Sequence, residues 1–392
     1  MKWRNMIPYG RQNINQDDID AVISVLQSDF LTQGPCVPAF EQAFTDYCDA
    51  HYAVATNSAT SALHIACLSL DVSMNDTVWT SPISFVASAN CALYCGAKID
   101  FVDIDINTGN LSVQALNHKL VAAKQSNTLP KVLILVHLAG QPCNMQAVKV
   151  LADEYDFKII EDASHAVGGK YKDSITGSCL YSDITIFSFH PVKIITSAEG
   201  GLALTNHKLL AEKMRLLRSH GIVSNTSRLT EPSHGPWYYQ QQTLGFNYRM
   251  TDIHAALGLS QMKRLDQFVA KRNKLAKNYD KAFKNTVLTP LYQAHDSYNS
   301  YHLYIILLPK ESIKNNKNFQ CTLISNLREN NICAHVHYIP IHLQPYYKEL
   351  GFNAGDFPNA EEYYARAVTI PLYPDLTDEE QQYIIKKLLS LI

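Results

Sequence analysis

Short apolar runs alternate with longer amphipathic stretches over roughly the first half of the chain. The apolar runs predict strands at 53–56, 98–104, 131–138, 157–162, 183–189 and 201–205. Helices are predicted at 60–70 and 145–155, where apolar residues recur with helical spacing. The runs at 131–138 and 157–162 are apolar almost throughout, which is typical of strands covered on both faces. The alternation predicts an α/β fold with a largely parallel sheet.

Two further stretches of polar sequence indicate how the chain is organised. Asn15, Asp17 and Asp18 precede apolar positions with helical spacing, so a helix is predicted to begin near Asp17. After Gly258, a long polar helix is predicted over 259–283, and a region rich in Tyr, His, Asn and Pro follows it. We therefore expect a large domain with an N-terminal arm over 1–257 and a smaller C-terminal α/β domain over 258–392.

Composition narrows the range of partners. The chain has 392 residues and a formal net charge of −2, with 46% hydrophobic and 18% charged residues. This length fits one large domain plus one smaller domain. Because the charges are few and nearly balanced, nothing electrostatic favours binding to nucleic acid or to an anionic membrane surface.

The cysteines and the N-terminal sequence indicate the cellular compartment of the protein. Nine cysteines lie between Cys36 and Cys333 without a C-x-x-C pair, which favours free thiols in a reducing compartment over a disulfide framework. The N-terminal sequence MKWRNMIPYG lacks the apolar run of a signal peptide. The apolar run at 132–136 ends at His137, far short of a membrane span. We expect a cytoplasmic protein.

Two ionisable residues follow predicted strands, where ligands bind in α/β sheets. Asp162 ends the strand at 157–162; it could cap the next helix, or it could keep the pyridine nitrogen of a cofactor protonated. Lys193 follows the strand at 183–189 and has apolar neighbours. Such surroundings lower the pKa of an amine and leave it free to form an imine with an aldehyde.

A polar turn and an aromatic residue are further candidates for ligand binding, beside Asp162 and Lys193. Ser58, Ala59 and Thr60 lie at a predicted helix N-terminus, where backbone N–H groups favour a phosphate, although such residues also cap helices without any ligand. Ser188 could add a hydroxyl to the same phosphate. Phe85 could pack in the core or stack on a cofactor ring.

At these residues the sequence resembles the sugar aminotransferases of the DegT/DnrJ/EryC1/StrS family, and the resemblance runs almost end to end. The matching segments are FLTQGP (30–35), NSATSAL (57–63), SPISFVASAN (81–90), EDASHA (161–166), SFHPVKIITSAEGG (188–201), LRSHGI (217–222), GFNYRMTDIHAALGLSQ (245–261), VHYIPIHLQPYY (336–347) and IPLYPDLT (370–377). The resemblance implies the aspartate-aminotransferase-like (type I) fold of enzymes that use pyridoxal 5′-phosphate (PLP).

The resemblance also implies roles for individual residues. Lys193 would carry PLP as a Schiff base and move the proton during transamination, Asp162 would pair with the pyridine nitrogen, and His165 would contact the 3-hydroxyl side. These three are the implied catalytic residues. The other implied cofactor contacts are Ser58, Ala59, Thr60, Phe85, Ser188 and, from the neighbouring subunit of a homodimer, Asn247. The implied nucleotide-sugar site consists of Tyr9, Asp29, Phe30, Leu31, Thr32, His335, Val336, His337 and Tyr338.

Within the family, the motifs are most similar to those of the pseudaminic acid branch. That similarity implies transfer of the amino group of L-glutamate, through pyridoxamine phosphate, onto C4 of a UDP-linked 4-keto-6-deoxy-N-acetylhexose. Another nucleotide-linked 3- or 4-keto sugar stays open as the substrate. A sugar dehydratase of the same fold would carry His in place of Lys193. A PLP-binding regulator without activity is disfavoured because Asp162, His165 and Lys193 occur together.

Three other features of the sequence bear on its function. A Rossmann oxidoreductase is disfavoured because no G-x-G-x-x-G follows a strand. His335, His337 and His342 lack a carboxylate or Cys at useful spacing, so no metal site is expected. Arg218 could bind an anion or could simply lie at a helix end, with Gly221 beyond it.

Overall fold

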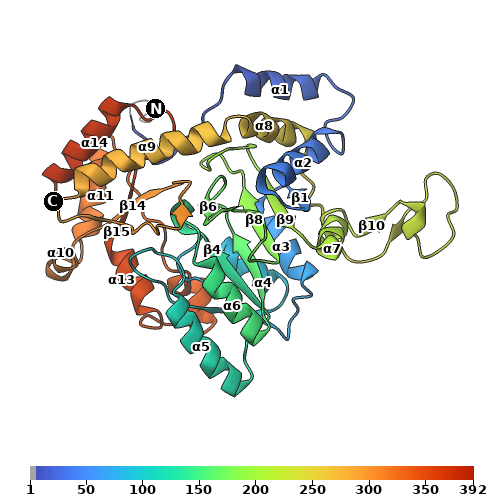
Figure 1. Cartoon of the computed structure of the whole chain (residues 1–392), viewed down its shortest axis with the longest axis horizontal. Helices are drawn as coiled ribbons and strands as arrows, with labels where there is room; N and C mark the ends of the chain where they lie inside the picture. The colour runs from blue at the N-terminus through green and yellow to red at the C-terminus, as the bar shows by residue number, and fades with distance from the viewer. Residues whose placement is uncertain (1–5) are drawn as a thin grey trace.

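The computed structural model describes residues 6–392, and a seven-stranded sheet lies at its centre (Figure 1). In order across the sheet, the strands are β1 (Tyr52–Thr56), β9 (Gly201–Thr205), β8 (Ile184–Ser188), β5 (Lys158–Asp162), β4 (Val132–Val136), β2 (Thr77–Thr80) and β3 (Lys98–Phe101). β9 runs antiparallel to both neighbours, and the remaining neighbouring pairs are parallel. The largely parallel sheet is confirmed, with β2 as a strand that the sequence analysis did not predict.

Helices cover both faces of the sheet. One face packs against α3 (Ala59–Ser69), α4 (Ala87–Tyr94) and α7 (Lys208–Arg218). The other face packs against α2 (Cys36–Cys48), α5 (Val113–Ser126), α6 (Met145–Tyr155) and α8 (Asp252–Met262). Because side chains alternate along a strand, neighbouring residues of one strand reach different helical layers.

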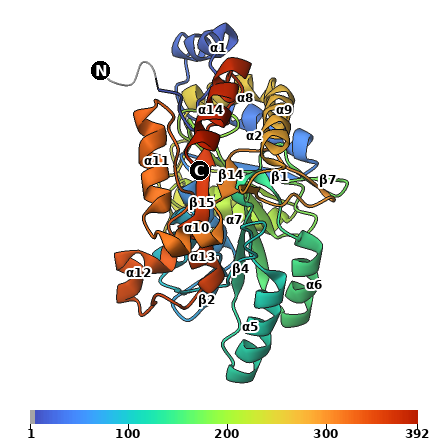
Figure 2. The same cartoon turned by 90° about the vertical axis from the view of Figure 1, so that its left-hand side faces the viewer.

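The C-terminal part has a hydrophobic core of its own, formed by α9 (Leu265–Phe283) and by the elements that follow it. Its sheet consists of β12 (Thr289–Pro290), β14 (Tyr304–Leu307) and β15 (Ala367–Ile370), paired antiparallel. Its helices are α10 (Lys310–Asn315), α11 (Phe319–Glu329), α12 (Pro345–Glu349), α13 (Pro358–Arg366) and α14 (Asp378–Ser390). Figure 2 shows α10, α11, α13 and α14 around β14 and β15.

The long helix predicted over 259–283 is wrong in one respect, because two helices, α8 and α9, cover this stretch. α8 ends at Met262, and Arg264 leaves the helical conformation before α9 begins. The guanidinium of Arg264 forms an ion pair with Asp18, which is fully buried. The break therefore brings Arg264 to the N-terminal arm. The predicted boundary at 257/258 lies within α8 and stays a prediction.

The predicted helix near Asp17 is confirmed as α1 (Gln16–Leu26). Asn15 caps it, and Asp18 completes a reciprocal capping box. The remaining strands are short: β6 (Lys170–Tyr171), β7 (Ser174–Ile175), β10 (Ile222–Val223), β11 (Gln240–Gln241) and β13 (Ser297–Tyr298). Single 3₁₀ turns lie at Leu138–Gly140, Thr226–Arg228 and Ile341–Leu343. Among the helices of residues 6–392, none is both long and apolar enough to cross a membrane.

Candidate active site

A cavity of about 550 Å³ opens at the carboxyl ends of β5 and β8. It brings together residues from distant parts of the chain: the N-terminal arm, the start of α3, the loops after β2, β5 and β8, and the C-terminal part. The sequence-predicted residues that line it are Tyr9, Ser58, Ala59, Thr60, Phe85, Asp162, His165, Ser188, Lys193, His335, His337 and Tyr338. Most of the predicted site is therefore one continuous pocket.

Lys193 follows β8 in a tight turn, in which its backbone N–H donates to the carbonyl of His190 at 2.9 Å. Burial lowers the pKa of the Lys193 amine to about 8, and the negative charge of Asp162 limits that fall. At pH 7 about a tenth of the amine is therefore uncharged, far more than for a lysine with an ordinary pKa of about 10.4, and the uncharged form is the nucleophile.

Asp162 ends β5 with both carboxylate oxygens engaged by hydroxyl groups. Its Oδ2 accepts from Ser88 Oγ at 2.5 Å, and its Oδ1 accepts from Ser164 Oγ at 2.6 Å. Ser84 lies 2.7 Å from Ser88, oxygen to oxygen, and extends the chain of hydroxyls. This network fixes the orientation of the carboxylate toward the cavity, and within residues 6–392 no cationic side chain forms an ion pair with it.

Ser88 and Ser164 are functional residues that the sequence patterns did not predict. Ser164 stands two residues after Asp162, the spacing at which an aspartate commonly accepts a hydrogen bond from the backbone. The contact between Ser164 and Asp162 could therefore have been predicted from the sequence. Ser88 comes from α4, and its contact with a residue 74 positions away leaves no local trace in the sequence.

His165 is a buried, neutral imidazole. Burial lowers its pKa well below the usual value, and the charge of Lys193 lowers it further. The backbone N–H of Ala139 donates to Nδ1 at 3.3 Å, so the ring hydrogen is on Nε2. Nε2 lies 3.0 Å from the hydroxyl oxygen of Tyr338, which therefore accepts this hydrogen.

The N-terminus of α3 forms a cradle for an anion. Ser58 caps the helix by accepting from the N–H of Ser61 at 3.2 Å. The N–H groups of Ala59 and Thr60 donate to no protein acceptor among the described residues. A Cβ at Gly201 would lie 2.4 Å from the carbonyl of Ser58, so only glycine lets β9 approach the cradle this closely. The free N–H groups and the helix dipole favour a phosphate.

Histidine and tyrosine side chains from the C-terminal part and the N-terminal arm line another wall. Nδ1 of His337 lies 2.9 Å from Thr369 Oγ1, and burial lowers the pKa of His337 to about 3. The ring of Tyr9 packs against His335 and His337, at centroid distances of 5.6 and 5.1 Å. Residues 6–392 contain no group of three or more His, Cys, Asp or Glu side chains that could hold a metal ion.

Several predicted residues lie outside this cavity. Asn247 is exposed, and its backbone pairs with Ser219. Asp29, Phe30, Leu31 and Thr32 form an exposed turn that is joined to the start of α8 through a bridge between Thr32 and Thr251. Val336 is half-buried between two lining residues but does not line the cavity itself.

Arg218 anchors a helix within the protein. Its Nη1 donates to Glu41 at 2.6 Å and to the carbonyl of Ala55 at 2.8 Å. These contacts join the end of α7 to α2 and β1, away from the cavity. Gly221 follows with a φ of +69°, the left-handed conformation expected just beyond a helix end.

Comparisons with known proteins agree with this geometry. The model of the DegT/DnrJ/EryC1/StrS aminotransferase family matches residues 12–389. A relative from Campylobacter jejuni, named UDP-4-amino-4,6-dideoxy-N-acetyl-beta-L-altrosamine transaminase, is 38% identical over 99% of this chain and 98% of its own.

Solved structures of similar proteins cover nearly the whole chain. Helicobacter pylori PseC, an aminotransferase involved in the biosynthesis of pseudoaminic acid, has a TM-score of 0.87 and 32% identity, covering 98% of this chain and 99% of its own. Spr1654 from Streptococcus pneumoniae, described as a sugar aminotransferase in its PMP form, has a TM-score of 0.89 and 28% identity, with 98% and 97% covered. The same protein is also known in a PLP form. The predicted fold class is confirmed, and the chain belongs to the DegT/DnrJ/EryC1/StrS aminotransferase family.

Proposed function

We propose that the protein is a PLP-dependent aminotransferase that transfers the amino group of L-glutamate onto C4 of a UDP-4-keto-6-deoxy-N-acetylhexose. The product is UDP-4-amino-4,6-dideoxy-N-acetyl-β-L-altrosamine, an intermediate of pseudaminic acid biosynthesis. The observation that carries the proposal is the buried amine of Lys193 in a cavity shared with Asp162. The substrate assignment rests on the Campylobacter relative and on Helicobacter PseC.

The cavity fits PLP in three respects. Lys193 is an amine with a depressed pKa, as attachment to the aldehyde requires. Asp162 is a carboxylate held by two hydroxyl groups and by no ion pair among the described residues, which suits it to a protonated pyridine nitrogen. The N-terminus of α3, with free N–H groups at Ala59 and Thr60, suits the phosphate. Ser188 and Phe85 also line the pocket, as a phosphate contact and a ring-stacking side chain would.

When bound, PLP supplies an electron sink that lets an amino group leave one carbon and join another. The residues of the chain do the remaining work. Lys193 alternates between its charged and neutral forms near neutral pH, so it can take a proton from a substrate carbon and return it. Asp162 stays oriented through Ser88 and Ser164, and it favours positive charge on the pyridine nitrogen.

His165 contributes a fixed dipole instead of a charge. Its neutral form is favoured by burial, and the contacts with Ala139 and Tyr338 fix its tautomer. A neutral His165 lets Asp162 remain the main charged partner of a bound ring. It also leaves Lys193 as the proton carrier, because a group with so low a pKa takes up few protons at neutral pH.

The nucleotide-sugar and dimer assignments form part of the same proposal. Tyr9, His335 and His337 line one wall of the cavity, where a sugar can reach Lys193. The turn at 29–32 and Asn247 lie on the surface of the single chain. We propose that they complete the site of a second copy in a homodimer, with Asn247 at the phosphate and the turn at the nucleotide sugar.

The cellular location is proposed from the cysteines. All nine lie within the described residues and are free thiols, and five of them are buried. Free thiols in this number fit a reducing compartment such as the cytoplasm.

A direct substrate test distinguishes this function from its alternatives. The purified protein is incubated with L-glutamate and a panel of UDP- and dTDP-linked 3- and 4-keto sugars, and products are followed by mass spectrometry and NMR. The proposal predicts amination at C4 of the UDP-4-keto-6-deoxy-N-acetylhexose. Amination of another keto sugar changes the assigned substrate, and loss of water without amination makes the protein a dehydratase.

A further inference from the structure

A buried carboxylate one residue before Asp162 joins the strands that carry the site. Glu161 lies in β5 and is 5% exposed. Because side chains alternate along a strand, Glu161 points to the sheet face opposite to that of Asp162, away from the cavity. None of the proposed catalytic steps uses it.

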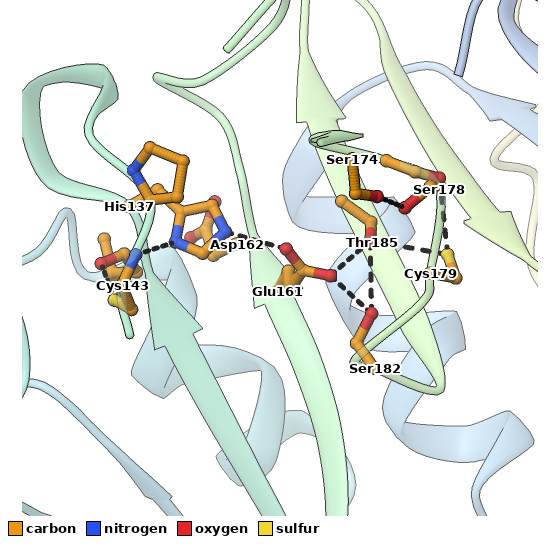
Figure 3. A network of polar contacts seen from close by, with 12 residues as sticks. His137, Cys143, Glu161, Asp162, Ser174, Ser178, Cys179, Ser182 and Thr185 are labelled. Carbon is orange, nitrogen blue, oxygen red and sulfur yellow. Dashed lines mark hydrogen bonds and ion pairs between the residues drawn. The ribbon is translucent and has the colours of Figure 1, made fainter. Parts of the chain in front are cut away.

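The carboxylate of Glu161 is hydrogen-bonded on both sides (Figure 3). Its Oε2 lies 2.8 Å from Nε2 of His137, which follows β4. Its Oε1 accepts from Thr185 Oγ1, in β8, at 2.9 Å and from Ser182 Oγ, just before β8, at 2.5 Å. One side chain therefore joins β4, β5 and β8 through hydrogen bonds that are separate from the backbone ladder.

The protonation of His137 and Glu161 follows from the hydrogen-bond donors around them. The backbone N–H of Cys143 donates to Nδ1 of His137 at 3.2 Å, so Nε2 carries the hydrogen that Glu161 accepts. Burial alone would raise the pKa of Glu161, but hydrogen bonds from His137, Ser182 and Thr185 hold it below its usual value. Glu161 is a buried, fully hydrogen-bonded carboxylate.

The strands that Glu161 joins, β4, β5 and β8, end at the candidate active site. Asp162 is the last residue of β5, and its carbonyl accepts from the backbone N–H of His137 at 3.2 Å. β8 ends at Ser188, with Lys193 in the turn that follows. Glu161 therefore contacts the three strands whose ends carry Asp162 and Lys193.

We propose that Glu161 is a positioning residue that fixes Asp162 relative to Lys193 by tying the end of β5 to His137 and to Thr185. Apolar residues of similar volume could fill such a space with equal or greater stability. A buried carboxylate is therefore explained better by the placement that it imposes than by the stability that it adds. The inference rests on the proposed aminotransferase function.

Two variants and one matched control test this role in the PLP-loaded enzyme. Glu161→Gln leaves one acceptor oxygen, which can face His137 or the hydroxyls of Ser182 and Thr185 but not both sides. Thr185→Val removes one hydrogen bond without changing any charge. Glu361→Gln is the control, because it disrupts another His–Glu pair outside the cavity, in which the half-buried Glu361 lies 3.0 Å from the buried His342. The measurements are Tm, kcat, KM and the visible circular dichroism of the bound cofactor, which reports how the ring is held.

The positioning role predicts a selective effect. Glu161→Gln should lower kcat by about tenfold or more, Thr185→Val by about threefold, and both should change the circular dichroism while KM stays within about twofold. Glu361→Gln should lower Tm and leave kcat and circular dichroism unchanged. If Glu161→Gln does not fold, Thr185→Val carries the test with the same two readouts.

Two outcomes distinguish failure of the positioning role from failure of the proposed function. Variants that lose Tm but keep the kcat and circular dichroism of the wild type would overturn the positioning role and leave Glu161 as a structural group. Wild-type protein that neither binds PLP nor reacts with L-glutamate would instead overturn the proposed function.

Discussion

The hydroxyl oxygen of Tyr338 lies 3.0 Å from Nε2 of His165, although the two residues are 173 positions apart in the chain. Tyr338 belongs to the C-terminal part, whereas His165 follows β5 of the central sheet. The contact therefore fixes the segment that carries His335 and His337 against the cofactor wall of the cavity. It links the proposed sugar side of the site to the proposed PLP side.

Tyr338→Phe tests this link. The variant keeps the aromatic ring and leaves the Nε2 hydrogen of His165 without its acceptor. We expect kcat to fall by about threefold to tenfold, as for a single buried neutral hydrogen bond. Steady-state kinetics with L-glutamate measure the effect. Unchanged kinetics would show that the contact is incidental to turnover.

Asp162→Asn tests the role of the carboxylate. An amide can keep one hydrogen bond with Ser88 or Ser164, so the fold should persist, but it cannot hold a pyridine nitrogen protonated. Activity should fall by about 10²-fold or more, on the scale of a lost charge-assisted hydrogen bond. A near-normal rate with intact PLP binding would leave Asp162 only as a cap for the segment after β5.

The pH dependence of Lys193 labelling tests its electrostatic surroundings. In protein free of PLP, an amine-reactive reagent should modify the peptide containing Lys193 with a midpoint near pH 8, because burial lowers the pKa to about 8. An exposed lysine should label with a midpoint of about 10.4. The carboxylate of Asp162 raises the pKa of Lys193, so Asp162→Asn should move the midpoint to lower pH. A midpoint near that of exposed lysines would contradict the buried amine.

Asn247→Ala tests the shared site. Although Asn247 lies outside the cavity of its own chain, the variant should retain PLP more weakly, as measured by dialysis and absorbance. Mixing inactive Lys193→Ala and inactive Asn247→Ala protomers should restore some activity, because one site of the heterodimer collects both substitutions and the other has neither. Subunit exchange without returning activity, or wild-type PLP retention in Asn247→Ala, would rule out sharing.

Local sequence patterns were sufficient for part of this structure. Apolar runs predicted six strands of the sheet, and the rule that ligands bind beyond strand ends pointed to Asp162 and Lys193. The match to family motifs supplied His165 and Tyr9, which also line the cavity.

Contacts between distant segments could not be predicted in the same way. Ser88 reaches Asp162 because α4 packs on one particular face of the sheet, and Arg264, at the break between α8 and α9, pairs with the buried Asp18, 246 positions away. The sequence alone does not choose between the two roles of Arg218, since its partner Glu41 lies 177 positions away. Such contacts depend on three-dimensional packing, which hydrophobic periodicity does not encode.

Chemical trapping of the cofactor tests the central claim most directly. Borohydride reduction of the purified, PLP-loaded protein fixes the cofactor covalently to the lysine that holds it, and peptide mass spectrometry then identifies that lysine. The account predicts a single label on the peptide containing Lys193, and no trapped label and no turnover in Lys193→Ala. A label on any other lysine, or turnover in Lys193→Ala, would contradict it.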